Sequence, residues 1–122
     1  MDRTLLLVGA TAAFIGVAFG AFGAHGLRGR LSPQMLTAFE TGVRYQMYHA
    51  LAILVTAVAI GFADDRLLRV GGWLFAVGIV LFSGSLYTLA LTGVTTLGMI
   101  TPLGGLAFLA GWALMIVAAL RH

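Results

Sequence analysis

The sequence predicts an all-α integral membrane protein, folded as a compact bundle of four transmembrane helices in one domain over residues 1–122. Two observations carry this prediction. Of the 122 residues, 61% are hydrophobic and only 9% are charged, whereas about 25% of the residues of a soluble domain are charged. Long uncharged segments also recur along the chain, and a helix needs roughly 20 apolar residues to cross the hydrocarbon. Such a chain cannot cover a water-facing surface and must face lipid.

The first half of the chain predicts two helices. Residues 4–24 carry no charge, and the flank before them is too weakly basic for a cleaved signal peptide. A second helix should begin at Ser32-Pro33, because serine caps free amides and proline fits the first helical turn. It should continue to about Phe62. A helix of that length exceeds the bilayer core, so its first turns should stand in the headgroup region or it should kink near Gly42. We therefore expect an extramembrane or interfacial segment before the second span.

The second half predicts two more helices. Residues 70–120 carry no formal charge, which is too long a stretch for one helix. The segment 92–96 and Thr101-Pro102 have the residue types that break helices. The expected membrane spans are residues 4–24, 43–63, 70–91 and 102–120.

Small residues recur along the first predicted helix at intervals that suit close helix packing. Gly16 and Gly20 form a GxxxG pair, which lets another backbone approach closely, and Gly9 lies on the same side. We expect these glycines to pack within the bundle. A seam between copies of the chain is the alternative.

An even number of spans places both chain ends on one side of the membrane. The arginines there would be residues 3, 66, 69 and 121, against residues 28, 30 and 44 on the other side. Since cytoplasmic loops are enriched in Lys and Arg, this margin favours a multi-pass protein of the cell (inner or plasma) membrane with both termini in the cytoplasm.

Polar residues within membrane helices are costly and often functional, and here they cluster where the first two helices meet. Glu40 and Arg44 lie four residues apart and can form a pair. His49 lies on a second helix face roughly 140° away, and His25 closes the first helix at the same membrane side. The predicted ligand or partner site comprises His25, Glu40, Arg44, Tyr45, Gln46, Tyr48 and His49.

Structural roles account for the same residues. The Glu40–Arg44 pair could tether a helix end, the tyrosines fit an interfacial aromatic belt, and the histidines could bond to backbone carbonyls. Two imidazoles with Glu40 also resemble a transition-metal ligand set, and histidines on different helices could bind haem axially. Whether His25 and His49 bind a metal stays open, and no cofactor is predicted.

Several function classes lack support. The arginines are scattered, with no basic stripe interleaved with aromatics, so we expect no nucleic-acid partner. No phosphate loop, dinucleotide fingerprint or nucleophile elbow is present. With no cysteine in the chain, disulfides, thiolate metal sites and cysteine nucleophiles are excluded.

Four segments of the chain resemble the domain of unknown function 423 family, which includes bacterial inner-membrane proteins of the YgdD and YwdK type and the vertebrate transmembrane protein 256. These segments are Gly20-Ala21-Phe22-Gly23-Ala24-His25-Gly26-Leu27, Glu40-Thr41 with Arg44-Tyr45-Gln46-Met47-Tyr48-His49-Ala50-Leu51, Phe82-Ser83-Gly84-Ser85-Leu86-Tyr87, and Ile100-Thr101-Pro102-Leu103-Gly104-Gly105. The resemblance covers essentially the whole chain. It implies a small protein of about four transmembrane helices and brings no activity, substrate or cofactor with it.

The sequence favours a non-enzymatic membrane protein, an accessory subunit or scaffold, that binds a partner or small ligand at the polar rim of the first two helices. Its partners would be the lipid bilayer and either another membrane protein or further copies of the chain. A small oligomeric transporter or channel, with a pore lined by hydroxyls of the last two helices, is the second hypothesis. A metal- or haem-binding redox protein is the third.

Overall fold

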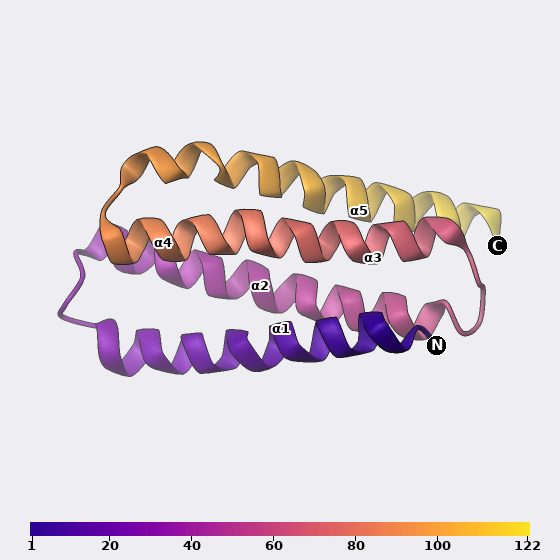
Figure 1. Cartoon of the computed structure of the whole chain (residues 1–122), viewed down its shortest axis with the longest axis horizontal. Helices are drawn as coiled ribbons and strands as arrows, with labels where there is room; N and C mark the ends of the chain where they lie inside the picture. Colours follow the sequence, from indigo (N-terminus) through magenta and orange to yellow (C-terminus); the bar gives the residue numbers. More distant parts are fainter.

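The computed structural model describes all 122 residues, which form four long helical rods that run alongside one another (Figure 1). The first rod joins α1 (Arg3–Phe22) to a π-helical turn, η1 (Gly23–Leu27), and the second is α2 (Pro33–Ala59). The third joins α3 (Arg66–Gly78), a π-helical segment η2 (Ile79–Ser83) and α4 (Gly84–Thr92). The fourth joins a 3-10 helix, η3 (Thr95–Met99), to α5 (Thr101–Arg121).

Three of the rods are long and apolar enough to cross a membrane, judged by length and composition: Arg3–Leu27, Arg66–Thr92 and Thr95–Arg121. The rod formed by α2 is not among them, although its 27 residues would extend about 40 Å at 1.5 Å per residue. It carries Glu40 and Arg44 in its third and fourth turns. The α2 rod is therefore as long as the other three and differs from them in being less apolar.

The start of α2 follows the sequence, its end comes slightly earlier than expected, and of the two expected alternatives the break near Gly42 does not occur. The Oγ of Ser32 accepts a hydrogen bond from the N–H of Met35 at 3.2 Å, as a cap should. The helix runs unbroken through Gly42 and ends at Ala59, before the expected end near Phe62. Its first turns do not stand alone. They pack beside the end of the first rod, because Phe39 closes onto Gly23.

The rods form two antiparallel hairpins that meet through α2 and α3. The first hairpin is α1 with α2, and the second is the α3–α4 rod with α5; α1 and α5 lie on opposite flanks (Figure 1). The hydrophobic core lies where the hairpins meet, and it includes the fully buried Leu5, Ile53 and Phe75. Because α2 lies between neighbours on several sides, it contributes the most buried side chains.

The predicted packing glycines of the first helix all face α2. A Cβ on Gly9 would lie 2.9 Å from Leu54 Cδ2, and one on Gly16 would lie 2.6 Å from the sulfur of Met47. At Gly20 the nearest atom, a methyl of Val43, would be 3.4 Å away. These glycines therefore serve contact between two helices of one chain.

A phenylalanine–glycine contact closes each hairpin. Phe39 packs on Gly23 in the first hairpin, and Phe108 packs on Gly78 in the second. Both phenylalanines follow a helix start with the same spacing and precede a buried glycine. The matching positions are Ser32-Pro33, Ala38-Phe39 and Gly42 in α2, and Thr101-Pro102, Ala107-Phe108 and Gly111 in α5. The second and fourth rods thus share one local packing pattern.

We expect Gly104→Ala to destabilise the second hairpin, because an added Cβ would lie 2.7 Å from the Cα of Phe82 in η2. Backbone cannot move aside as a side-chain end can, so a loss of about 1–3 kcal/mol is expected. Thermal unfolding of the purified protein in detergent measures it. The control is Gly105→Ala, where a Cβ meets no atom within 4 Å. Equal melting temperatures for the two variants would contradict this packing.

Candidate functional site

Gln46 joins three helices from a buried position on α2. Its Nε2 donates to the carbonyl of Ala12 in α1 at 2.8 Å, and its Oε1 accepts from the hydroxyl of Tyr87 in α4 at 2.6 Å. The side chain is 4% exposed. Water is absent from the hydrocarbon, so a buried amide needs partners within the protein. Here it has one on each side.

Beside this amide, η2 and α4 both contact α2. Ser83 donates from Oγ to the carbonyl of Gly42 at 2.6 Å. A Cβ on Gly42 would lie 2.8 Å from the ring of Tyr87, so the glycine makes room for the ring that bonds Gln46. Nearby, the hydroxyls of Ser85 and Thr101 share a hydrogen bond of 2.6 Å between α4 and α5.

His49 occupies the α5 side of α2, near the middle of the bundle. Its Nδ1 lies 2.8 Å from the carbonyl of Tyr45, and its Nε2 lies 3.0 Å from the indole Nε1 of Trp112. Because an indole N–H only donates, Nε2 must accept, and we assign the imidazole hydrogen to Nδ1. The ring also stacks on Phe108, with centroids 3.5 Å apart. His49 therefore links α2 to α5.

A groove of about 570 Å³ opens beside this imidazole between α2 and α5. Aromatic side chains dominate its walls. The lining residues include Tyr45, His49, Phe82, Phe108 and Trp112. Both nitrogens of His49 are already engaged, so the groove offers an occupant mainly ring faces and edges.

The predicted site residues do not converge. His49 is buried against α5, whereas His25 is exposed in η1 at the end of the first rod. Glu40 and Arg44 point outward from a different face of α2 and do not form the expected ion pair. Arg44 instead donates from Nη2 to Thr41 Oγ1 at 3.2 Å. His25, His49 and Glu40 therefore lie apart, on η1 and on two different faces of α2, and do not form the common set that a shared metal or haem site would need.

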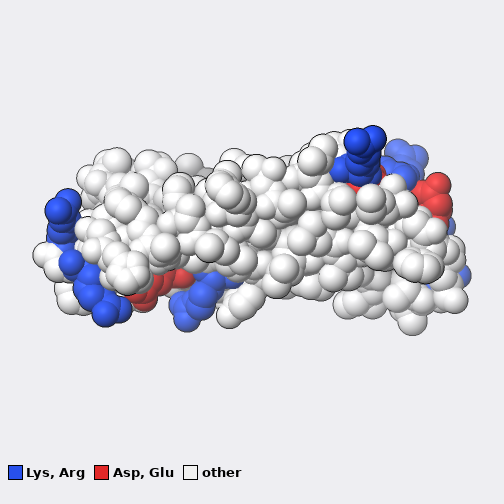
Figure 2. Space-filling view, turned by 90° about the horizontal axis from the view of Figure 1, so that it is seen from below, with Lys and Arg blue, Asp and Glu red and all other residues white.

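Most charged side chains gather at the two ends of the bundle, but one acidic and basic patch lies inward of an end, along the lower edge of Figure 2. Glu40 and Arg44 supply such an inward pair on α2. A hollow of about 300 Å³ lies beside them, between α1 and α2. Its other lining residues are Phe19, Gly20, Gly23, Phe39 and Val43.

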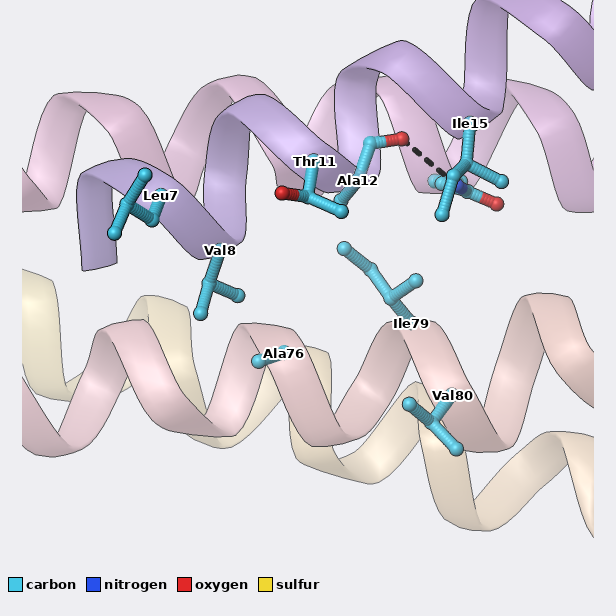
Figure 3. A pocket seen from close by; sticks show the side chains of 9 residues that line it. Leu7, Val8, Thr11, Ala12, Ile15, Ala76, Ile79 and Val80 are labelled. Carbon is cyan, nitrogen blue, oxygen red and sulfur yellow. Dashed lines mark hydrogen bonds between the residues drawn. The ribbon is translucent and has the colours of Figure 1, made fainter. Parts of the chain in front are cut away.

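A second groove, of about 390 Å³, runs between α1 and α3 (Figure 3). Apolar side chains such as Val8, Ile79 and Val80 line it. Gln46 also lines the groove, and its hydrogen bond to the carbonyl of Ala12 is the dashed line in the figure. This lining suits lipid chains rather than a polar ligand.

The end that holds both termini carries a charged network that the sequence analysis did not anticipate. Asp2 caps α1 by accepting from Leu5 N–H at 3.1 Å, and its other oxygen pairs with Arg69 at 3.1 Å. Asp65 caps α3 by accepting from Leu67 N–H at 2.8 Å. The side chain of Asp65 also pairs with His122 Nε2 at 3.1 Å and with Arg121 at 3.7 Å.

These contacts favour the charged carboxylates. The Leu5 N–H, and then Arg69, hold the pKa of Asp2 below its ordinary value. The Leu67 N–H does the same for the pKa of Asp65, helped by His122 and Arg121. An Asp within two or three residues of the start of an apolar run is a helix-start signal, so sequence reasoning had the means to find both caps. It had no signal for Tyr87 or Trp112 as partners of the α2 amide and imidazole.

The fold and its polar contacts define a small integral membrane protein with four helices held together by interhelical hydrogen bonds. The chain belongs to the family described as "Protein of unknown function (DUF423)", whose pattern matches residues 19–105. The membership that the sequence motifs suggested is therefore confirmed, as is the predicted transmembrane bundle.

Bacterial membrane proteins match the chain over nearly its full length. It is 46% identical to the UPF0382 membrane protein YwdK of Bacillus subtilis, with 98% of both chains covered. It is 45% identical to the UPF0382 inner membrane protein YgdD of Escherichia coli K12, covering 98% of this chain and 92% of that protein. A UPF0382 membrane protein of Staphylococcus haemolyticus is 44% identical over 98% and 97% of the two chains. No solved structure gives a significant match.

We expect Trp112→Phe to lower the stability of the bundle by about 1–2 kcal/mol, because an interhelical bond is lost and His49 Nε2 is left without its donor. The phenyl ring keeps most of the packing against Phe75. Thermal unfolding followed by the remaining tryptophan measures the loss. Trp73→Phe is the matched control, since Trp73 is 42% exposed on α3. A Trp112 variant as stable as the control would show that the bond to His49 is dispensable.

Proposed function

We propose that this protein is a non-enzymatic accessory or scaffold protein of the cell membrane, which binds a membrane-embedded partner through the outward face of α2. The observation that carries the proposal is the exposure of Glu40 and Arg44 on a face turned away from the bundle. The outward face of α2 comprises Thr37, Glu40, Thr41, Arg44, Tyr48, Leu51, Val55 and Val58.

The depth of Arg44 makes its exposure costly. It lies between Val43, which packs beside Gly20, and Met47, which packs beside Gly16. Both glycines belong to the uncharged segment 4–24, so Arg44 lies about 8 Å inside its end at 1.5 Å per residue. A charged side chain near the centre of a membrane helix costs about 2.5–3.5 kcal/mol, and less as it nears the interface.

The contacts within the chain do not fully compensate this cost. Arg44 has five N–H donors, and Thr41 accepts from one nitrogen. The side chain leans toward the near end of α2 through that bond, which shortens the path to the headgroups. A protein partner with complementary charge would satisfy both Arg44 and Glu40.

The division of polar groups supports binding rather than catalysis. The amide of Gln46, the imidazole of His49 and the hydroxyl of Ser83 all bond between helices. The hydroxyls that a pore would need are similarly engaged, since Ser85 bonds Thr101 and Thr88 bonds the carbonyl of Gly84. Of the residues predicted for the site, Glu40, Arg44 and Tyr48 are the ones that face outward on α2.

A photoreactive benzophenone amino acid in place of Tyr48, which is 56% exposed, should form a discrete protein adduct when illuminated in membranes. The same group in place of Phe14 on α1, 77% exposed, should label lipid. Both replacements keep an aromatic ring on an exposed position, so folding is unaffected. Adduct mass, measured by immunoblot and mass spectrometry, gives the result. Lipid labelling alone at position 48 would reject a protein partner.

We also propose that both termini face the cytoplasm. Figure 1 places them at one end of the bundle, where the arginines are residues 3, 66, 69 and 121. Since Arg44 lies within α2 rather than in a loop, the opposite end retains Arg28 and Arg30. The bias toward the terminal end supports this orientation.

A reporter active only in the cytoplasm should therefore be active when fused after His122, and one active only outside should be silent there. The same two reporters inserted in the turn at Gly29, where φ is +85°, should give the opposite result: the externally active one works and the cytoplasmic one is silent. An externally active fusion at His122 would reverse the proposed orientation.

A further inference from the structure

We propose that the partner bound by the outward face of α2 is a second copy of this chain, so that two bundles associate along their α2 helices. This inference rests on the proposed function and names its partner. It is argued from the charges, the spacing and the shape of that face.

The charges of the outward face are self-complementary. Glu40 and Arg44 lie four residues apart, just over one turn, which is about 6 Å along the axis. A two-fold axis along the bundle would bring two α2 helices together in parallel, and each Arg44 could then reach Glu40 of the other copy. Such an isologous contact makes two ion pairs, because each copy contributes one acid and one base. It leaves no net charge in the lipid.

Arg44 is already directed toward this contact. Its bond to Thr41 Oγ1 at 3.2 Å draws the guanidinium toward the level of Glu40, which is next to Thr41 in the chain. An unrelated partner would need its own acid and base at matching depth. A second copy supplies both without further assumption.

The spacing along the face suits a helix pair. Thr37, Thr41, Arg44, Tyr48, Leu51, Val55 and Val58 alternate intervals of four and three residues, which is the pattern of a left-handed helix seam. Any straight helix face approximates this spacing, so the spacing is only compatible with a helix pair. The charges of Glu40 and Arg44 are what favour a second copy as the partner. The apolar half, Leu51 and Val55, is 53% and 59% exposed.

The shape of the face offers places for side chains of another helix. The hollow of about 300 Å³ borders Glu40 and Arg44, and another of about 410 Å³ lies farther along, at Leu54, Val55, Val58 and Ala59. The two hollows flank Tyr48 and Leu51. Side chains of a facing α2 would enter both.

Disulfide formation tests this arrangement directly, because the natural chain contains no cysteine. Leu51→Cys and Val58→Cys should each form covalent homodimers when oxidised in native membranes, since identical residues face one another in a parallel two-fold pair. Phe14→Cys on α1 and Leu106→Cys on α5 are matched controls, with wild-type side chains 77% and 62% exposed. They should remain monomeric.

Charge exchange tests the pairing. Glu40→Arg and Arg44→Glu should each weaken self-association about tenfold, equivalent to about 1.4 kcal/mol, and the double variant should restore it. Dissociation constants come from fluorescence energy transfer between labelled copies in vesicles of defined lipid content. Far-UV circular dichroism confirms that each variant folds. A double variant as weak as the single variants would overturn the ion pairing.

The two proposals fail differently. Suppose that Leu51→Cys and Val58→Cys cross-link no more than the controls, while the photoreactive group at position 48 labels a different protein. That result would overturn self-association and leave the proposed partner-binding face intact. If neither a disulfide-linked dimer nor any protein adduct forms, both proposals are overturned. A photoadduct with the mass of two copies supports both.

Discussion

The absence of water in the hydrocarbon is the constraint on which this structure depends. A buried amide or imidazole there must find partners within the protein. The polar side chains of α2 find them on the neighbouring helices. Gln46 bonds α1 and α4, and His49 bonds Trp112 of α5. These few polar contacts join helices whose remaining contacts are apolar and include the close glycine contacts described above. They fix which faces of the rods meet, a choice that apolar burial alone specifies weakly in lipid.

The charged side chains are placed differently from the buried neutral polar ones. Asp2 and Asp65 lie at one end of the bundle, where each caps a helix and pairs with basic groups. Glu40 and Arg44 lie inward of the other end and do not pair with each other. The buried amide of Gln46 and the imidazole of His49 therefore turn in toward other helices of the chain, whereas Glu40 and Arg44 turn out.

The sequence contained the local information and lacked the long-range information. Uncharged runs, with Ser32-Pro33 and Thr101-Pro102, placed the helices closely, because those signals are contained within a turn or two. The C-terminal end of α2 was less well predicted, since its final turns are apolar with no distinct stop signal. Six of the seven predicted site residues lie on α2 and His25 lies in η1, but Trp112 and Tyr87 come from distant segments. Their pairing depends on which helix faces meet, and no spacing within α2 encodes that.

The π-helical segment η2 within the third rod (Ile79–Ser83) has a consequence for how one helix serves two neighbours. A π turn accommodates one residue more than an α turn and so rotates everything after it relative to everything before. Ahead of it, Gly71 contacts Gly111 of α5 and Gly72 lies against Thr56 of α2. After it, Ser85 bonds Thr101 of α5 and Tyr87 bonds Gln46 of α2. The wide turn thus sets the register between the two halves of the rod, so that the faces of both halves meet the same two neighbours. A chain that gained or lost a residue at this point would change the angle between those faces without changing the composition of either.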